Sequence, residues 1–330
     1  MIRPFKKGVD LIMQLRFGYV SNALALYEAS PARTMTFATW SKLPKEEREA
    51  KLHGITETNL KSTLRALHYN IAHEIDLYRM SSSIVPLATH PEATWDYITP
   101  FRELFEEIGN LVKKHGLRVS FHPNQFTLFT SPKSHVTENA IGDLNYHVAM
   151  LDAMGLDTRS IVNIHIGGAY GDKEETLKRF YKNFDTIPTA LRSHVTLEND
   201  DKTYTAQETL EACEQTGVPF IFDYHHHMAN PGEGLPDRFF ERVYETWESR
   251  GIRPKFHLSS PKSTSAYRSH ADYVDSEFAI PFLNMLKEHG EDADIMIEAK
   301  KKDLAALQLV EDLSAVRGVK QLNGGSIQWK

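Results

Sequence analysis

Ile221-Phe222-Asp223-Tyr224-His225-His226-His227 is the stretch in which an apolar run changes abruptly into side chains that can bind metals. The run follows Gly217 and Pro219, which end a helical pattern, and a short apolar run bounded in this way is typical of a buried parallel strand. Asp223 and His226 would then lie where the strand leaves the core, and both could bind one divalent ion. A surface patch that titrates with pH, or a buried and hydrogen-bonded Asp223, would explain this stretch alone equally well.

Apolar runs of this kind alternate with helical patterns along the whole chain, as in βα units around a parallel sheet. We expect eight strands, at residues 16–20, 77–81, 117–122, 160–165, 195–200, 221–227, 255–259 and 294–298. Helical patterns between them include 45–70, 140–154, 174–183, 237–250 and 303–316. The series predicts a single-domain (β/α)8 TIM barrel over residues 16–330, with residues 1–15 as an N-terminal extension. The alternative, an open doubly wound sheet, would place a glycine-rich turn after the first strand, where Gly18 stands alone.

The composition is that of an ordinary globular protein, with 41% hydrophobic and 25% charged residues among 330. The net charge of -6 disfavours binding of nucleic acid by charge alone, although divalent ions would supply positive charge where a phosphate binds. Cys213 is the only cysteine, so no internal disulfide can form and a reducing compartment is expected. No stretch approaches the ~18 apolar residues of a membrane span. We therefore expect a cytoplasmic protein without a membrane segment, and a monomer.

Side chains that can bind metals recur at the strand ends. From the third expected strand onward they are His122, His165, Glu198, Asp223 with His226, His257 and Glu298. The carboxyl ends of barrel strands meet at one face, so these side chains would converge in one mouth. Any single histidine is more often a hydrogen-bonded core or rim residue, but polar groups that converge from six strand ends without a cation would destabilise one another. The pattern therefore predicts a metal centre.

The donor set narrows the choice of metal. Imidazoles and carboxylates without a thiolate suit manganese, zinc, cobalt or iron. There are more ligands than one ion needs, and two or three ions that share carboxylates stabilise both oxygens of an in-line phosphoryl displacement. Lys255 lies two residues before His257 in the same strand, so its side chain points toward the same metal centre. A positive ammonium group is unfavourable beside metal ions, so Lys255 would have to be neutral, become carboxylated or turn to a substrate phosphate. A lysine that extends to solvent from the strand start is the simpler alternative.

The motifs resemble those of the UV damage endonucleases, repair enzymes that nick DNA immediately 5′ to a photoproduct. The matching segments are GYVSN (18–22), YRMSSS (78–83), ATHP (88–91), HPNQF (122–126), NIHIGG (163–168), LENDDK (197–202), DYHH (223–226), KFHLS (255–259), RSHAD (268–272) and MIEAK (296–300). They occur in the expected order over almost the whole chain, and residues 1–15 fall outside them.

The resemblance implies an endonuclease IV-like barrel with a cluster of three metal ions, often manganese. By this resemblance His122, His165 and Glu198 would hold one ion, Glu198, Asp223, His257 and Glu298 a second, and His226 and His270 a third. A carboxylated Lys255 would contribute to the cluster, and His90 would contact a phosphate or a metal. The implied catalytic residues are thus Glu198, Lys255 and His90.

The resemblance also implies UV-damaged double-stranded DNA as the substrate. Tyr19 and Gln125 would probe the strand opposite the flipped lesion, with Asn22 nearby, because a damaged dinucleotide is poorly stacked and easily extruded. Phe126 would stack on DNA, although it lacks the hydroxyl that some relatives carry there. The DNA backbone would be bound by Arg268, with Lys262 and the lysines at 300–302.

We hypothesise metal-assisted attack of hydroxide on the phosphate 5′ to cyclobutane dimers and 6-4 photoproducts, with a 3′-hydroxyl as the leaving group. Abasic sites are left open as a further substrate. Sugar isomerases and epimerases also arrange His, Asp and Glu around divalent ions, but they need fewer ligands. An amidohydrolase would fit a carboxylated lysine, but it would carry a His-x-His pair where this chain has Phe17-Gly18-Tyr19. A damage-recognition protein that does not cleave DNA is the alternative from a different class.

Overall fold

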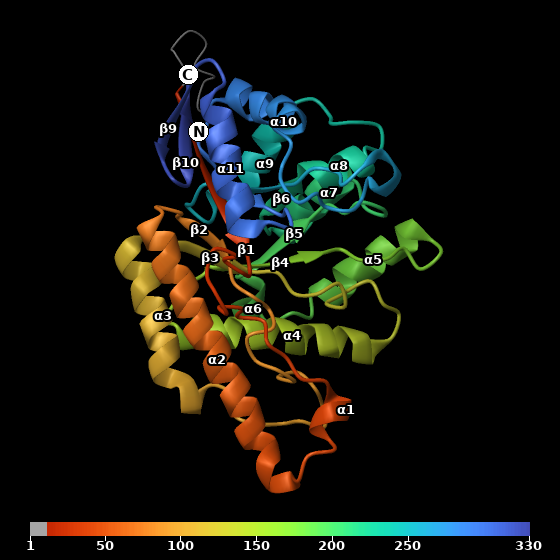
Figure 1. Cartoon of the computed structure of the whole chain (residues 1–330). Coiled ribbons are helices and arrows are strands. Elements are labelled where there is room, and N and C mark those ends of the chain that lie inside the picture. Colours follow the sequence, from red (N-terminus) through yellow and green to blue (C-terminus); the bar gives the residue numbers. More distant parts are fainter. Residues whose placement is uncertain (1–11) are drawn as a thin grey trace.

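Eight parallel strands close into a barrel in the structure, a computed structural model that describes residues 12–330 (Figure 1). In chain order they are β1 (Met13–Val20), β2 (Leu77–Arg79), β3 (Arg118–Phe121), β4 (Ile161–His165), β5 (Val195–Glu198), β6 (Phe220–Asp223), β7 (Lys255–Leu258) and β8 (Ala293–Ile297). β1 pairs in parallel with both β2 and β8, which closes the barrel. The predicted (β/α)8 TIM barrel is confirmed, and each expected strand overlaps an observed one.

Helices surround the barrel. They are α1 (Phe37–Trp40), α2 (Lys45–Ala72), α3 (Arg102–His115), α4 (Ser134–Ala153), α5 (Lys173–Phe184), α6 (Thr189–Arg192), α7 (Ala206–Thr216), α8 (Tyr224–Ala229), α9 (Phe239–Glu248), α10 (Ser276–His289) and α11 (Lys302–Ser314), with the 3-10 turns η1 (Thr99–Phe101) and η2 (Thr264–Ala266). Local sequence sets their ends: α7 begins with reciprocal hydrogen bonds between Thr205 and Glu208 and ends at Gly217, whose φ of 71° suits a left-handed cap. Within residues 12–330, none of these helices has the length and apolar character that a bilayer span requires.

The N-terminal boundary of the barrel differs from the prediction. The apolar pattern predicts a strand from residue 16, whereas β1 begins at Met13. Met13 and Leu15 are fully buried, so a boundary after residue 15 is wrong and residues 13–15 belong to the barrel. The predicted extension otherwise consists of Ile12 and of residues 1–11, which lie outside the described residues.

A C-terminal hairpin extends the sheet beyond the barrel. Its strands are β9 (Val319–Asn323) and β10 (Ser326–Trp329), and β10 pairs antiparallel with the first half of β1. The apolar pattern does not predict β9, because its sequence VKQLN lacks alternation and is largely exposed. The available signal is Asn323-Gly324, a dipeptide typical of hairpin turns. Glycine is required at 324, since a β-carbon there would collide with the carbonyl oxygen of His73.

A buried ionic network lies at the amino end of the barrel. Both oxygens of Asp294 on β8 accept hydrogen bonds of 2.7 Å from Arg16, and one of them also accepts a hydrogen bond of 2.7 Å from Arg118. Burial alone would raise the pKa of Asp294, but Arg118 and Arg16 outweigh it and hold this pKa below its ordinary value. The paired charges join β1, β3 and β8 beneath the mouth.

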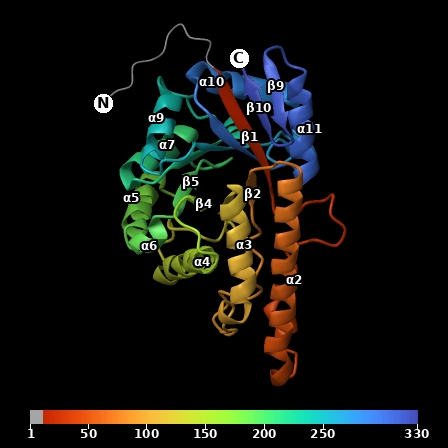
Figure 2. The ribbon, with the colours of Figure 1, turned by 90° about the vertical axis from the view of Figure 1, so that its left-hand side faces the viewer.

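Helix α2 forms a long projection beside the mouth of the barrel (Figures 1 and 2). The chain leaves the carboxyl end of β1, forms α1 and returns along the 28 residues of α2, so the first turns of α2 stand beyond the strand ends. Asn59 on α2 ties two mouth loops together: its side chain accepts from Arg33 N (3.0 Å) and donates to Arg33 O (2.8 Å) and Ile84 O (2.9 Å).

Candidate metal centre

The predicted ligands converge at the carboxyl ends of the strands. His165 and Glu198 are the last residues of β4 and β5 and stand in register, as do Asp223 of β6 and His257 of β7. The remaining ligands predicted for the first two ions directly follow a strand: His122 comes after β3 and Glu298 after β8. Parallel strands in register thus bring side chains from distant parts of the sequence to one face of the barrel.

Glu198 lies at the centre of this face and is almost completely buried. Its Oε2 lies 3.1 Å from His257 Nδ1, 3.3 Å from His122 Nε2 and 4.0 Å from His165 Nε2. His257 Nδ1 also lies 3.0 Å from Glu298 Oε1. One carboxylate therefore links imidazoles from both sides of the barrel.

Two groups of potential ligands share Glu198. Each group has ligand atoms that all lie within 4.8 Å of one another, and the groups are His122, His165 and Glu198, and Glu198, Asp223, His257 and Glu298. These are the residues predicted for the first two ions. The predicted third pair is nearby, since His226 Nδ1 lies 3.3 Å from Glu198 Oε1 and the His226 and His270 ring centres are 6.3 Å apart. Among the described residues, however, this pair does not form a further group of three.

Three of the histidines are oriented by backbone carbonyl groups. His165 Nδ1 lies 3.2 Å from the carbonyl oxygen of Glu198, and His226 Nδ1 lies 3.0 Å from that of Asn199. His270 Nδ1 faces the carbonyl oxygen of Glu298. When Nδ1 donates to a carbonyl, Nε2 is left unprotonated for a ligand, and metal-binding histidines are commonly held in this way.

Unpaired buried atoms show that the centre fits a cation. Glu198 Oε1, Asp223 Oδ2 and His257 Nδ1 are buried and make no well-directed hydrogen bond within the described residues. Buried polar atoms are rarely left unsatisfied, and all three of these belong to one group of potential ligands. A divalent ion would satisfy them together, so the residues fit the predicted metal centre.

The electrostatics of the centre favour an ionised carboxylate. Burial lowers the pKa of His122 to about 4. Burial would also lower the pKa of His257, but Glu198 and Glu298 outweigh it and raise this pKa to about 9. Burial would raise the pKa of Glu198, yet His257 and His165 hold it well below the ordinary value. An ionised carboxylate among imidazoles is a state suited to binding a metal, and protons would be released if a metal bound there.

Two residues around the ligands were not among the predicted site residues. Asn163 on β4 donates to the carboxylate of Glu198 and accepts from Thr196 Oγ1 at 2.9 Å, so it orients this carboxylate. Arg79, the last residue of β2, donates to Glu298 Oε1. Two features of the sequence could have identified these residues. Asn163 lies two residues before His165, on the same side of the strand, and Arg79 lies at the end of a strand.

Lys255 lies deeper in the barrel. It is almost completely buried, and its Nζ donates to Ser120 Oγ at 2.8 Å. Burial, together with the nearby charge of Arg118, places the pKa of Lys255 well below its ordinary value. The alternative of a lysine that extends to solvent is therefore wrong.

The predicted DNA-binding residues fall into exposed and buried sets. Gln125 and Phe126 are exposed on the loop after β3, with Phe126 at 73%, and Asn22 is half-buried beside Ser21. Tyr19 is fully buried, and its hydroxyl donates to Asn70 Oδ1 at 2.7 Å. In this conformation Tyr19 has no exposed surface, so its contact with the lesion stays a prediction that requires the ring to move.

Other predicted residues lie at the rim of the mouth. Arg268 is exposed, and its Nε lies 3.7 Å from Asp201. His90 stacks on the ring of Phe37, with ring centres 4.0 Å apart, and is outside both groups of potential ligands. Lys302 is half-buried near Arg79, and burial, with the charge of Arg79, lowers its pKa.

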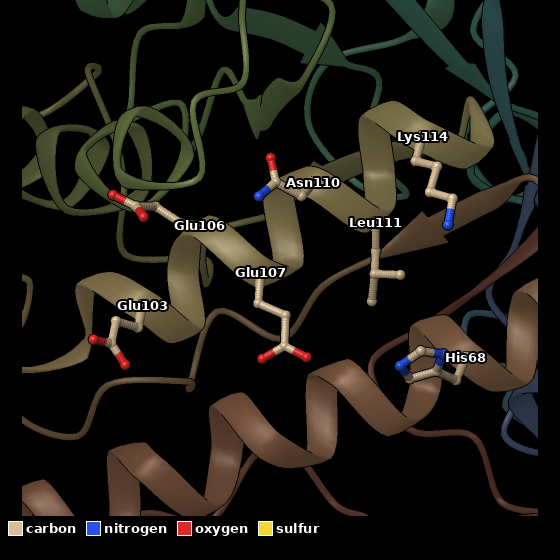
Figure 3. A pocket seen from close by; sticks show the side chains of 7 residues that line it. All are labelled: His68, Glu103, Glu106, Glu107, Asn110, Leu111 and Lys114. Atoms are coloured by element: carbon tan, nitrogen blue, oxygen red, sulfur yellow. The ribbon is translucent and has the colours of Figure 1, made fainter.

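A separate groove lies between α2 and α3 on the outside of the barrel (Figure 3). Its volume is about 340 Å³, and its lining includes Glu103, Glu106 and Glu107 with His68 and Lys114. These carboxylates would repel a phosphodiester backbone, so the groove does not suit DNA.

Comparison with known proteins agrees with this geometry. A family model described as UV-endonuclease UvdE matches residues 15–330. The UV DNA damage endonucleases of Bacillus pumilus and Bacillus velezensis are 59% and 57% identical over 319 residues, which is 96% of this chain and 100% of each relative. The crystal structure of SacUVDE is 30% identical with a TM-score of 0.81, over 91% of this chain and 98% of that one. Endonuclease IV from Thermus thermophilus shares the fold, with a TM-score of 0.51 at 13% identity over 86% of this chain and 91% of that one. By sequence and by structure, the chain belongs to the UV-endonuclease family.

Proposed function

We propose that this protein is a metal-dependent endonuclease that nicks UV-damaged double-stranded DNA immediately 5′ to cyclobutane dimers and 6-4 photoproducts and leaves a 3′-hydroxyl. The observation that carries this proposal is the pair of ligand groups that share Glu198 at the mouth of the barrel. Two ions held close together suit displacement at a phosphate. Membership of the UV-endonuclease family supports damaged DNA as the substrate.

The metal centre would hold two or three divalent ions. The two groups that share Glu198 would bind two of them, and His226 with His270 would contribute to a third. Imidazole and carboxylate donors without a thiolate support manganese, with zinc, cobalt or iron as alternatives. When bound, such ions neutralise charge on the phosphate and lower the pKa of water.

Residues around the ions would support the reaction. Asn163 holds the Glu198 carboxylate in place. The guanidinium of Arg79 lies beside Glu298, and this side chain can turn to bind a DNA phosphate. Lys255 is buried, and burial together with the nearby charge of Arg118 holds its pKa well below the ordinary value, which favours the neutral amine. A neutral amine can react with carbon dioxide to form a carbamate with release of a proton, and the resulting carboxylated Lys255 would place a negative group on the same side of β7 as His257.

The DNA would lie across the loops around the mouth. Gln125 and Phe126 are exposed there and would enter the space left by an extruded lesion, with Asn22 alongside. Arg268 would exchange its contact with Asp201 for a DNA phosphate, and His90, Lys262 and the lysines at 300–302 would bind the backbone around it. One chain is expected to suffice, because one barrel supplies all ligands of both groups.

A plasmid-nicking assay tests the proposal. Supercoiled plasmid, UV-irradiated or untreated, is incubated with the protein after chelation and again after Mn²⁺ is restored. We expect nicking of irradiated plasmid only, loss of nicking with chelator and recovery with Mn²⁺. An end-labelled duplex with one thymine dimer then locates the cut. Equal nicking of both plasmids would overturn the damage specificity, and full activity in chelator would overturn the metal dependence.

A further inference from the structure

Most of the large apolar side chains that are exposed in the described part of the chain lie on the connections after the strands. Nine large hydrophobic side chains are exposed among residues 12–330. Seven of them lie on segments that directly follow the strands, the side on which the metal ligands also lie: Leu24, Tyr27, Phe126, Tyr170, Met228, Tyr273 and Leu304. The connections that follow the strands therefore carry most of the large apolar side chains that are exposed among the described residues.

Tyr170 stands out among them because its backbone is strained. It lies on the loop between β4 and α5, is 53% exposed and has a φ of 43°, a left-handed conformation that residues other than glycine rarely adopt. Of the seven described non-glycine residues with positive φ, five follow strand ends, namely Ser21, Glu28, Leu87, Tyr170 and Lys302. Strain of this kind persists mainly at functional sites. The ring is half-exposed, so burial in the core does not account for the strain.

Arg179 on α5 joins Tyr170 to the neighbouring loop that carries Phe126. The guanidinium carbon of Arg179 lies 5.9 Å from the centre of the Tyr170 ring, and its Nε donates to the carbonyl oxygen of Thr130 at 2.8 Å. The two loops also pack directly, since a β-carbon at Gly167 would lie only 2.7 Å from Thr130 Oγ1. Tyr170 and Phe126 therefore lie on two loops that pack against each other.

We propose that Tyr170 is a second stacking residue for damaged DNA, whose ring binds the face of an unstacked base next to the lesion. This inference rests on the proposed function. Every base offers a π-face once it is unstacked, and aromatic side chains bind such faces without regard to sequence. A photoproduct supplies unstacked bases at low energetic expense. Tyr170 follows His165, a residue of the first group of ligands, by five residues, on the loop that leaves the carboxyl end of β4.

The test compares Tyr170→Gly with Tyr170→Phe in the full-length protein. Binding is measured by fluorescence anisotropy with a duplex oligonucleotide that carries one thymine dimer, in chelator so that no cleavage occurs. Thermal unfolding is measured on the same samples. We expect Tyr170→Gly to bind the dimer-containing duplex about tenfold more weakly, while Tyr170→Phe binds as the wild type does. The Tm of Tyr170→Gly should be unchanged or higher, because glycine adopts positive φ without strain.

Leu322→Ala is the matched control, because Leu322 is an exposed apolar residue on β9, away from the strand ends. It should leave binding unchanged. A lower Tm for Tyr170→Gly, unchanged binding, an equal loss for undamaged duplex, or an equal loss in Tyr170→Phe would each overturn the proposal. If the wild type fails to prefer the dimer-containing duplex, it is instead the proposed function that fails.

Discussion

Replacement of Glu198 by Gln removes the charge that the two ligand groups share while it preserves the shape of the side chain. Asn163 can still donate to the amide oxygen of Gln, so the fold should remain. Both groups contain Glu198, and a neutral amide is a poor ligand beside imidazoles for a divalent ion. We therefore expect Glu198→Gln to lose its bound metal and its ability to nick irradiated plasmid.

The size of the effect follows from linkage between binding and folding. A ligand at 100 times its Kd stabilises the folded state by about 2.7 kcal/mol. A chain of 330 residues has an unfolding entropy of about 0.7 kcal/mol/K, so a saturating divalent ion should raise the Tm of the wild type by about 4 °C. In Glu198→Gln this rise should disappear.

Differential scanning calorimetry with and without Mn²⁺, alongside the nicking assay, checks this prediction. The matched control is Glu208→Gln, which makes the same chemical change at the start of α7, and it should keep both the Mn²⁺-dependent rise and the nicking. The reasoning is refuted if Glu198→Gln keeps the wild-type rise in Tm, or nicks irradiated plasmid at the wild-type rate.

Three further predictions concern the scaffold and the DNA surface. Asp294→Asn should lower the free energy of unfolding at pH 7 by about 3–5 kcal/mol, because it leaves Arg118 buried without a counter-charge. The pKa of Asp294 is lowered in the folded state, so its contribution to stability is present above the unfolded pKa of about 4 and is lost as pH falls through the folded pKa. In urea unfolding, the free energies of unfolding of the wild type and the variant should therefore converge below pH ~4. A difference between them that stays constant with pH would contradict this prediction. Asn59→Ala should lower the free energy of unfolding by about 2–3 kcal/mol, because the carbonyl groups of Arg33 and Ile84 lose their donor. A change below ~0.5 kcal/mol in urea unfolding would show that other contacts replace these hydrogen bonds. Gln125→Ala should reduce the preference for irradiated over untreated plasmid more than it reduces bound metal, and the opposite ranking would exclude a role in probing the lesion.

The convergence of the ligands could be predicted from the sequence, because the carboxyl ends of all barrel strands meet at one face. His165 and Glu198 are 33 residues apart, yet strand register brings them together. A polar residue at the end of a parallel strand has its location fixed by the fold class alone. His122, Asp223, His257 and Glu298 follow the same rule. Their division into two groups, which matches the structure, was implied by the resemblance to the UV damage endonucleases.

Residues whose surroundings depend on packing could not be placed in this way. Tyr19 is the next-to-last residue of β1, but its ring turns into the core toward Asn70 of α2, and the angle at which α2 packs is not encoded locally. Similarly, the contact between Arg79 and Glu298 joins residues 219 positions apart through side-chain conformation. Loop residues such as Tyr170 carry no periodic pattern, so only its backbone conformation in the structure distinguishes it from other exposed tyrosines.

The most direct test of the central claim is the number of metal ions bound to each chain. The wild-type protein would be loaded with Mn²⁺, freed of unbound metal and analysed by inductively coupled plasma mass spectrometry against protein concentration. Two ligand groups joined at Glu198 predict at least two ions per chain. A value of one or fewer would contradict a shared metal centre at the mouth of this barrel.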